Sequence, residues 1–526
     1  MSTPTATKLE FGRWRSFFWP VHKFELKKLL PMFFMFFFIN FNYTILRDTK
    51  DALIVTAAGS GAEAIPFLKV WGVVPFAVIF MIVYSKLSNT LSKPRLFYTM
   101  ISVFIAFFAL FALVLYPNRE LFHPTDMADR LQAFLPKGLS GFVALFRNWT
   151  FALFYIMAEL WGSVAISLLF WGFANDTTKV GESKRFYSMF GLGANLAMLV
   201  SGRLIVYFSD MKNRVAPGVD PWGVSLNYML SMVVLSAVIV MGIYWWINKN
   251  VLTDKRFYDQ SEVKKSKKDK PSLSFKESFT YLVKSKYIGC LAILVLAYGV
   301  AINLVEVTWK GQLKIQYPDP SDYSAFMGNF SVITGVLTIF MMLFVGGNVI
   351  RRFGWGMGAL ITPVVLLITG VGFFSFVIFR DSLAGFIAMF GTTPTMLAVI
   401  FGMIQNIMSK SAKYSLFDPT KEMAYIPLDQ ESKVKGKAAI DVIAARLGKS
   451  GGSLINQGLI VALGSLAAIT PYVAAILFFI IFAWIYAAKS LSKQFGELNA
   501  EKEQDQKKTP RLTAGEPLLA KGNVQQ

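Results

Sequence analysis

The chain has 526 residues, of which 54% are hydrophobic, 15% aromatic and only 16% charged, and its mean hydropathy is +0.49. This composition is typical of a polytopic membrane protein rather than a soluble globular one. The formal net charge is +21, but the cations stand in short segments between apolar runs, which argues against a nucleic-acid-binding domain. A single cysteine, Cys290, and two histidines, His22 and His123, exclude a disulfide framework and a transition-metal cluster.

The N-terminal segment, residues 1–28, is basic and precedes the first apolar run. Its excess of Lys and Arg predicts that it lies in the cytoplasm. The first apolar run starts near Leu29 and ends in Arg47-Asp48 rather than in a small-residue cleavage site. We therefore expect no cleavable signal peptide, and the run should remain as the first span.

Apolar runs long enough to cross roughly 30 Å of hydrocarbon recur along the chain. They form two series on either side of a basic linker that contains the string KKSKKDKPS. An excess of Lys and Arg on alternate loops predicts that both termini are cytoplasmic. The expected spans lie near 29–46, 65–84, 96–115, 148–172, 187–208, 225–247, 287–306, 326–349, 357–379, 384–408, 450–467 and 470–488.

This arrangement predicts an all-α polytopic membrane protein of about twelve transmembrane helices, arranged as two six-helix bundles. A weak internal repeat supports it, because NDTTKVGESKRF after the fourth span and LDQESKVKGKAA after the tenth both place Lys-Val in a polar loop. The pattern fits two bundles that rock about a central site, as in the major facilitator superfamily. The expected parts are a cytoplasmic N-terminal segment (1–28), an N-terminal bundle (29–247), a basic cytoplasmic linker (248–286), a C-terminal bundle (287–488) and a polar cytoplasmic tail (489–526).

Strong charge runs directly into an apolar segment within residues 423–457. Lys449 lies there in a Leu-Gly-Lys-Ser-Gly-Gly stretch that opens into the run SLINQGLIVALG. A lysine at that depth is costly unless an anion compensates it, and a helix N-terminus already favours negative charge. We interpret Lys449, with Arg446 nearby, as part of a phosphate site. Three lysines earlier in the stretch fit an ordinary cytoplasmic loop at least as well: Lys433, Lys435 and Lys437.

Three more ionisable residues lie within or at the end of apolar runs, where such residues are functional candidates by default. Lys69 lies in the second span, although its place near the start would also let it snorkel to the interface. Glu159 lies well inside the fourth span, where the alternative is a buried structural ion pair. Glu306 ends the seventh span after Asn303 and could also be a wetted cap. With Lys449, these residues suggest lysines that bind phosphates and acids that pair with them, or carry protons, in the empty state.

Two further polar features each allow a functional and a structural interpretation. Asn195 lies beside glycines in the fifth span, where its amide could pair with an adenine edge or could join two spans by a hydrogen bond. Lys50 belongs to the patch Arg47-Asp48-Thr49-Lys50-Asp51, just beyond the first apolar run. That patch could bind substrate or could neutralise itself as an ion-pair network.

Signatures of catalysis are missing from the sequence. The Gly-Lys-Ser of ARLGKSGG is not a Walker A loop, because Ile443 stands five residues before Gly448 where a glycine is required. Two histidines in or near loops do not suggest a Ser-His-Asp set, and no Gly-x-Gly-x-x-Gly follows a predicted strand. We expect no enzymatic activity and no cofactor.

Four long strings carry a family resemblance: FNYTILRDTKDALIVTA (41–57), AELWGSVAISLLFWGFAN (158–175), INLVEVTWK (302–310) and SKSAKYSLFDPTKEMAYIPLD (409–429). With KVKGKAAID and LGKSGGSLI, they make the sequence resemble the non-mitochondrial ATP/ADP translocases of plastids and of obligate intracellular bacteria such as chlamydiae and rickettsiae. The resemblance covers most of the chain. It implies a twelve-helix carrier of major-facilitator type that exchanges ATP for ADP and takes up host or cytosolic ATP.

The resemblance also implies roles for particular residues. Lys69, Glu159, Glu306 and Lys449 match two lysines and two glutamates that are important for transport in the family, and Asn195 is a candidate for base selection. It implies a bacterial inner membrane, with the plastid inner envelope as the alternative. The expected partners are ATP, ADP, the lipid bilayer and, if it travels with ADP, inorganic phosphate. No nucleic acid and no protein partner are inferred.

Two other functions remain open from the sequence. Members of this family differ, and some import several nucleoside triphosphates with protons, in which case the buried Glu159 would be the proton site. A receptor or scaffold that docks partners on the basic linker would not require charge inside the spans. An ATP-for-ADP exchange moves about one net negative charge, worth about 2.3 kcal/mol per 100 mV, unless phosphate balances it.

Overall fold

The computed structural model describes residues 21–254, 257, 285–429, 433, 436–437, 440 and 444–508. These residues form helices and turns, with no strand among them. Helices suit the expected membrane environment because each one satisfies its backbone hydrogen bonds internally. The predicted linker falls mostly outside the described residues, as do the first 20 residues and the end of the predicted tail.

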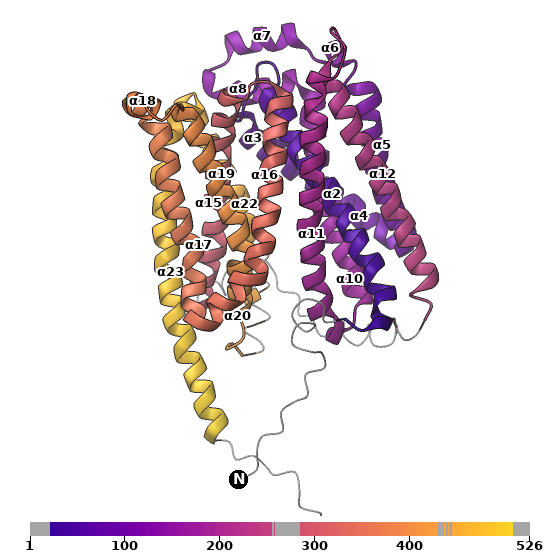
Figure 1. Cartoon of the computed structure of the whole chain (residues 1–526), viewed down its shortest axis with the longest axis vertical. Coiled ribbons are helices and arrows are strands. Elements are labelled where there is room, and N and C mark those ends of the chain that lie inside the picture. The colour runs from indigo at the N-terminus through magenta and orange to yellow at the C-terminus, as the bar shows by residue number, and fades with distance from the viewer. Residues whose placement is uncertain are drawn as a thin grey trace, which may run out of the picture.

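The first half of the chain supplies six helical stretches that match the six predicted spans, with short helices between them (Figure 1). Segments labelled η are 3-10 or π-helical. The elements are η1 (Lys23–Glu25), α2 (Leu26–Thr56), α3 (Ala64–Phe67), η2 (Leu68–Val73), α4 (Val74–Thr90), α5 (Lys93–Leu110), η3 (Phe111–Leu115), α6 (Arg119–Phe122), α7 (Thr125–Phe134), η4 (Lys137–Leu139), α8 (Ser140–Arg147), α9 (Trp149–Trp161), η5 (Gly162–Phe170), α10 (Trp171–Thr177), α11 (Val180–Ser209), η6 (Asp210–Asn213) and α12 (Pro221–Asn250).

The second half is built in the same way. Its elements are α15 (Lys286–Gln316), α16 (Pro320–Phe340), η7 (Met341–Gly346), α17 (Gly347–Ile378), α18 (Arg380–Ala388), α19 (Pro394–Ala412), η8 (Lys413–Phe417), α20 (Asp418–Ala424), α22 (Ala445–Leu463) and α23 (Leu466–Lys508).

Nine stretches of the described chain are long and apolar enough to cross a membrane. One of them, Pro320–Ile378, is interrupted at Gly354, whose φ is +80°, and Figure 1 shows α16 and α17 as separate rods. The second half also contains α19 and α22, which brings it to six long helices. Each half therefore has the six long helices that the sequence predicts. The prediction of an all-α, polytopic, major-facilitator-like fold is confirmed.

Several predicted boundaries differ from the structure, and the seventh span, expected to end at Glu306, continues in α15 to Gln316. The first span was expected to end at residue 46, but α2 continues to Thr56, so the charged patch lies inside the helix, where its own ion pairs compensate its charges. The tenth span was expected from residue 384, but it starts at Pro394, because the positive φ of Gly391 separates α18 from α19. Finally, α23 runs past residue 489, where the polar tail was expected, and ends at Lys508.

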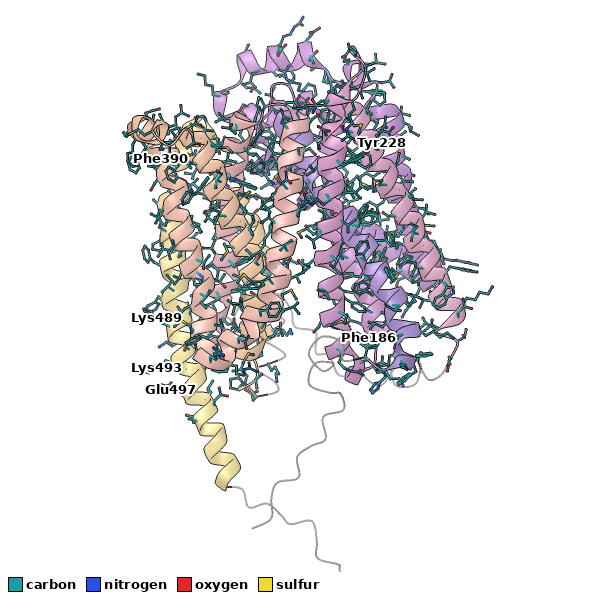
Figure 2. The ribbon with its side chains drawn as sticks, in the orientation of Figure 1. Phe186, Tyr228, Phe390, Lys489, Lys493 and Glu497 are labelled. Carbon is teal, nitrogen blue, oxygen red and sulfur yellow. The ribbon has the colours of Figure 1, made fainter. Side chains whose placement is uncertain are left out.

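The far end of α23 stands apart from the other helices. Lys489, Lys493 and Glu497 project from it beside and below the rest of the fold (Figure 2). Lys493 and Glu497 form an (i, i+4) ion pair at 4.0 Å, with side chains that are 81% and 57% exposed. Such a pair supports an isolated helix only weakly.

The helices from α2 to α12 and those from α15 to α23 form two groups in Figure 1. We call the end that carries α3, η4 and η6 the closed end, because the strongest contacts between the groups lie between it and the middle of the protein. At the other end, which we call the open end, the groups diverge toward α10 and α20 (Figure 1).

Small residues bring α11 and α16 together near the closed end. A Cβ atom on Gly202 would lie 2.6 Å from the carbonyl oxygen of Gly328, and one on Gly328 would lie 2.8 Å from that of Gly202. Only glycine permits this approach of two backbones. The contact therefore belongs to the conformation in which the closed end is shut.

Two buried tryptophans position the helices that carry the candidate site. Trp161, at the end of α9, donates a hydrogen bond of 3.0 Å to the carbonyl oxygen of Ile39 in α2. Trp309 of α15 donates one of 2.9 Å to that of Val399 in α19. Each tryptophan lies within a helical turn of a candidate glutamate, so it fixes the position of that acid relative to a neighbouring helix.

Candidate functional site

Six charged side chains form one network where the two groups of helices meet, on the closed-end side of the middle. Three are cations and three are carboxylates, so the network is neutral when all are ionised. Its members are Lys50 and Asp51 of α2, Lys69 of η2, Glu159 of α9, and Glu306 and Lys310 of α15.

Lys50 connects α2 to α9. Its Nζ lies 2.9 Å from a carboxylate oxygen of Asp51 and 3.0 Å from one of Glu159, and it stands 3.8 Å from the centre of the Tyr155 ring. The side chain of Lys50 is 4% exposed, whereas that of Glu159 is 33% exposed. The buried lysine is thus held by two acids and an aromatic face, and one of those acids remains accessible.

Lys310 joins the two groups of helices. Its Nζ lies 2.7 Å from a carboxylate oxygen of Asp51 in the first group and 2.8 Å from one of Glu306, one turn earlier on α15. The side chains of Lys310 and Asp51 are each 2% exposed. Removing one member of a buried pair leaves an uncompensated charge, so this bridge ties α2 to α15 firmly.

Lys69 makes the second connection between the groups. It donates a hydrogen bond of 2.8 Å to Oδ1 of Asn303 and lies 3.3 Å from a carboxylate oxygen of Glu306. The amide nitrogen of Asn303 donates to the carbonyl oxygen of Gly299, which holds its oxygen toward the lysine. Lys69 and Glu306 are 21% and 27% exposed, so an anion in water can reach this pair, unlike the buried bridge at Lys310.

A second polar contact lies beside the network. Arg47 of α2 pairs with the neighbouring Asp48 at 2.8 Å, and both bond to the hydroxyl of Ser331 on α16, at 2.6 Å and 2.7 Å. Asp48 is fully buried. The patch in α2 therefore neutralises itself through ion pairs. Lys50 belongs to the network, and its binding of substrate stays a prediction.

Local helix geometry marks two of the site residues. Lys69 lies within η2, which is π-helical, and Glu159 lies three residues before η5, which is also π-helical. Such segments are rare and occur frequently at functional sites, because the extra residue in the turn re-aims neighbouring side chains.

Asn195 lies outside the network. Its amide donates a hydrogen bond of 2.9 Å to the carbonyl oxygen of Gly191 on its own helix and lies 3.7 Å from the sulfur of Met342 in the other group. Its side chain is largely buried, at 6% exposure. The arrangement resembles the interhelical contact that the sequence offered as an alternative, and base selection stays a prediction.

The two basic residues expected near residue 450 are not seen in the network. Arg446 is exposed, and the side chain of Lys449 lies outside the described residues. The expectation that Lys449 stands at a helix N-terminus is wrong, because α22 begins at Ala445 and places it in the second turn. The adjacent glycines stay helical because they pack against α15: a Cβ on Gly452 would lie 2.7 Å from that of Asn303.

Three members of the site were not identified as such from the sequence. Asp51 was assigned to a patch beyond the first span, and Asn303 was treated only as a neighbour of Glu306. Lys310 was read within a family string but not as a site residue, although Glu306 and Lys310 stand four residues apart, the spacing of an ion pair on a helix. Within the described residues, no group of His, Cys, Asp and Glu side chains could hold a metal ion.

The sequence matches a known family over nearly its whole length. The model of the family described as TLC ATP/ADP transporter matches residues 5–495. The chain is 63% identical to ADP,ATP carrier protein 1 of Chlamydia pneumoniae, over 94% of this chain and 96% of that protein. It is 55% identical to ADP,ATP carrier protein 2, chloroplastic, of Arabidopsis thaliana, over 91% and 76%. It is 46% identical to ADP,ATP carrier protein 1 of Rickettsia bellii, over 93% and 97%.

Solved structures share the fold at low sequence identity. A bacterial homologue of the iron transporter ferroportin, in an inward-facing state, superposes with a TM-score of 0.54 at 13% identity, over 89% of this chain and 100% of that one. A D-xylose-proton symporter gives 0.51 at 11% identity, over 89% and 97%. At these identities the likeness concerns the fold alone.

Proposed function

Because the chain belongs to the TLC ATP/ADP transporter family, we propose that it is a multi-pass membrane antiporter that exchanges ATP for ADP by alternating access. It is a carrier and not an enzyme. The observation that carries the proposal is the neutral network between the two groups of helices, whose lysines are all paired with acids. Phosphate oxygens bind lysine as carboxylates do, so a nucleotide can replace an acid as the partner of a network lysine.

The exchange of partners starts at Lys69. Of the two connections that the network makes between the groups, its pair with Glu306 is the accessible one, at 3.3 Å and with both side chains more than a fifth exposed. A phosphate that takes Lys69 releases Glu306, which then keeps Lys310 as its partner at 2.8 Å. The nucleotide thereby loosens one bond between the groups and leaves no carboxylate of this pair unpaired.

Movement of two bundles completes the cycle. We assign the bundles to residues 29–247 and 287–488, which rock about the network so that the site faces each side in turn. The structure has the arrangement of one end state, since its strongest contacts between the halves lie from the middle to the closed end. With both termini in the cytoplasm, the open end is the cytoplasmic end, and the closed end faces the outside of a bacterial inner membrane or of a plastid inner envelope.

The candidate substrate residues divide by their surroundings. Lys50, Lys69, Glu159 and Glu306 are assigned to the phosphate region by their mutual contacts. Arg446 and Lys449 remain proposals from the sequence. So does base recognition by Asn195, whose contact with Met342 would have to open for its amide to meet an adenine. Inorganic phosphate that moves with ADP would balance the charge difference from ATP, and no protein partner is required.

Uptake into proteoliposomes tests the function. Vesicles preloaded with ADP, with GTP or with nothing would receive labelled ATP at controlled membrane potential and pH. Exchange predicts uptake that requires internal ADP, ignores GTP and survives collapse of the proton gradient. Uptake into empty vesicles that follows the proton gradient would instead identify a proton-coupled importer of nucleoside triphosphates, with Glu159 as the first candidate for the proton site. Absence of uptake under every condition would favour a receptor or scaffold.

A further inference from the structure

One lysine near the network has no acid of its own. Lys410 lies in the last turn of α19, half-buried between the buried Ser409 and Ser411. Its Nζ stands 4.6 Å from the centre of the Phe330 ring on α16. Within the described part of the chain, no carboxylate lies at salt-bridge distance from it.

The cations of the described charged network and Arg47 differ from Lys410 in this respect. The cations of the central region that have partners are Arg47, Lys50, Lys69 and Lys310, and the carboxylates that hold them are Asp48, Asp51, Glu159 and Glu306. Four cations and four acids cancel, so the charge of Lys410 is a surplus. The charged groups that act on it include Arg47 and Lys310, which repel it, and Glu306 and Asp48, which attract it.

An aromatic face alone compensates a lysine poorly at such a depth. A cation–π contact contributes about 0.5–2 kcal/mol, less than the cost of an unpaired charge inside a membrane. A lysine that is kept there without an acid therefore suits an anion that arrives from outside the protein. Lysine binds phosphate as a point charge with three donors.

The place of Lys410 along its helix fits a substrate that enters from the open end. Its Cα is sixteen residues from Pro394 at the closed end, or about 24 Å along α19. Glu306 is ten residues from the closed end of α15, or about 15 Å along that helix. Side chains of a helix lean toward its N-terminus, so the ammonium group of Lys410 reaches back toward the network.

We propose that Lys410 is a phosphate-binding residue of the second half of the chain, and that it is the first cation of the central region met by a nucleotide from the open end. The proposal rests on the proposed function. It adds a lysine that a phosphate can bind without first displacing an acid. Lys410 gathers the phosphates by attraction alone, and the exchange of partners at Lys69 follows.

Binding to the full-length protein in nanodiscs tests this role. The variant Lys410→Gln should weaken ADP binding roughly ten- to hundredfold, the loss expected for a hydrogen bond between charged groups. The affinity for inorganic pyrophosphate should fall by a similar factor, whereas the affinity for adenosine should stay unchanged. Lys410→Arg should restore most of the affinity. Lys493→Gln, which removes an exposed cation from α23, is the matched control and should bind as the wild type does.

Thiol labelling supplies a second, independent measurement. Cys290 is the only cysteine, so Cys290→Ser gives a background free of thiols. On it, Lys410→Cys should react with a water-soluble thiol reagent, and ADP should slow the reaction.

The outcomes separate this inference from the function on which it rests. If the wild type neither binds nor exchanges ADP, the proposed function fails. If the wild type does both, but Lys410→Gln binds ADP and pyrophosphate as tightly, the role of Lys410 is refuted and the exchanger stands. With ADP at a concentration that saturates Lys410→Cys, labelling that ADP does not slow would also refute it, even if Lys410→Gln failed to fold.

Discussion

The close contact between α11 and α16 makes a sharp prediction for Gly328→Ala. The new Cβ would lie 2.8 Å from the carbonyl oxygen of Gly202 and 2.9 Å from Cγ2 of Val206, where ordinary contacts begin near 3.4 Å. The two helices must separate by roughly half an ångström, and such overpacking costs about 1–3 kcal/mol. The cost falls on the conformation with the closed end shut, since opening that end separates the helices.

A cost of about 1–3 kcal/mol shifts the equilibrium between the two end states by a factor of roughly 5 to 150 toward opening of the closed end. The salt bridge between Lys212 and Asp322 gives a place to measure this shift, because it joins the two halves at the closed end. The pair Lys212→Cys and Asp322→Cys, in the Cys290→Ser background, should be cross-linked by a short bifunctional thiol reagent. Adding Gly328→Ala should slow that reaction.

The matched control is Gly242→Ala. A Cβ at Gly242 meets nothing within 4 Å, so this substitution tests alanine in a helix without the steric conflict. Cross-linking should then proceed as in the parent pair. Equal rates for Gly328→Ala and Gly242→Ala would refute the reasoning that the glycine contact holds the closed end shut.

Three further predictions concern the charged network. Lys69→Ala and Lys449→Ala should each weaken nucleotide uptake while the protein stays folded; wild-type uptake in both would contradict the assignment of these lysines to phosphate. Lys310→Met should destabilise the protein by about 3–5 kcal/mol, because Asp51 would lose its partner from the second half. Thermal unfolding in detergent measures this loss of stability. An unchanged Tm would contradict the prediction. Exchanging the charges of the pair, Lys69→Glu with Glu306→Lys, should restore only part of the stability lost in Glu306→Lys, because Lys310 also loses its acid on α15. It should not restore uptake, and a double-mutant cycle without coupling would rule out the pair.

The helices could be predicted from the sequence to a large extent, because the membrane imposes length and hydropathy on each span. The errors in their bounds have local causes. The charges from Arg47 to Asp51 suggested an end of the first span, yet α2 continues because those charges are paired within the protein. The glycines after Lys449 suggested a turn, yet they remain helical because α15 packs against them.

The candidate site was only partly visible in the sequence. Lys69, Glu159 and Glu306 stood out because each is a charge within or at the end of an apolar run. Their pairing could not be predicted, because Lys69 and Glu306 are 237 residues apart in the sequence and their contact depends on how the two halves pack. Lys310 and Lys410 could not be identified because each follows the expected end of its span, where a lysine commonly serves as an interfacial anchor.

Two salt bridges of the charged network cross between the halves, and they bear on coupling. An unloaded carrier holds itself shut through Lys310 with Asp51 and through Lys69 with Glu306. To return without cargo it would have to break both bridges and gain nothing in exchange, whereas a nucleotide supplies replacement bonds as they break. We therefore expect the empty carrier to return slowly, which would favour exchange over net uptake.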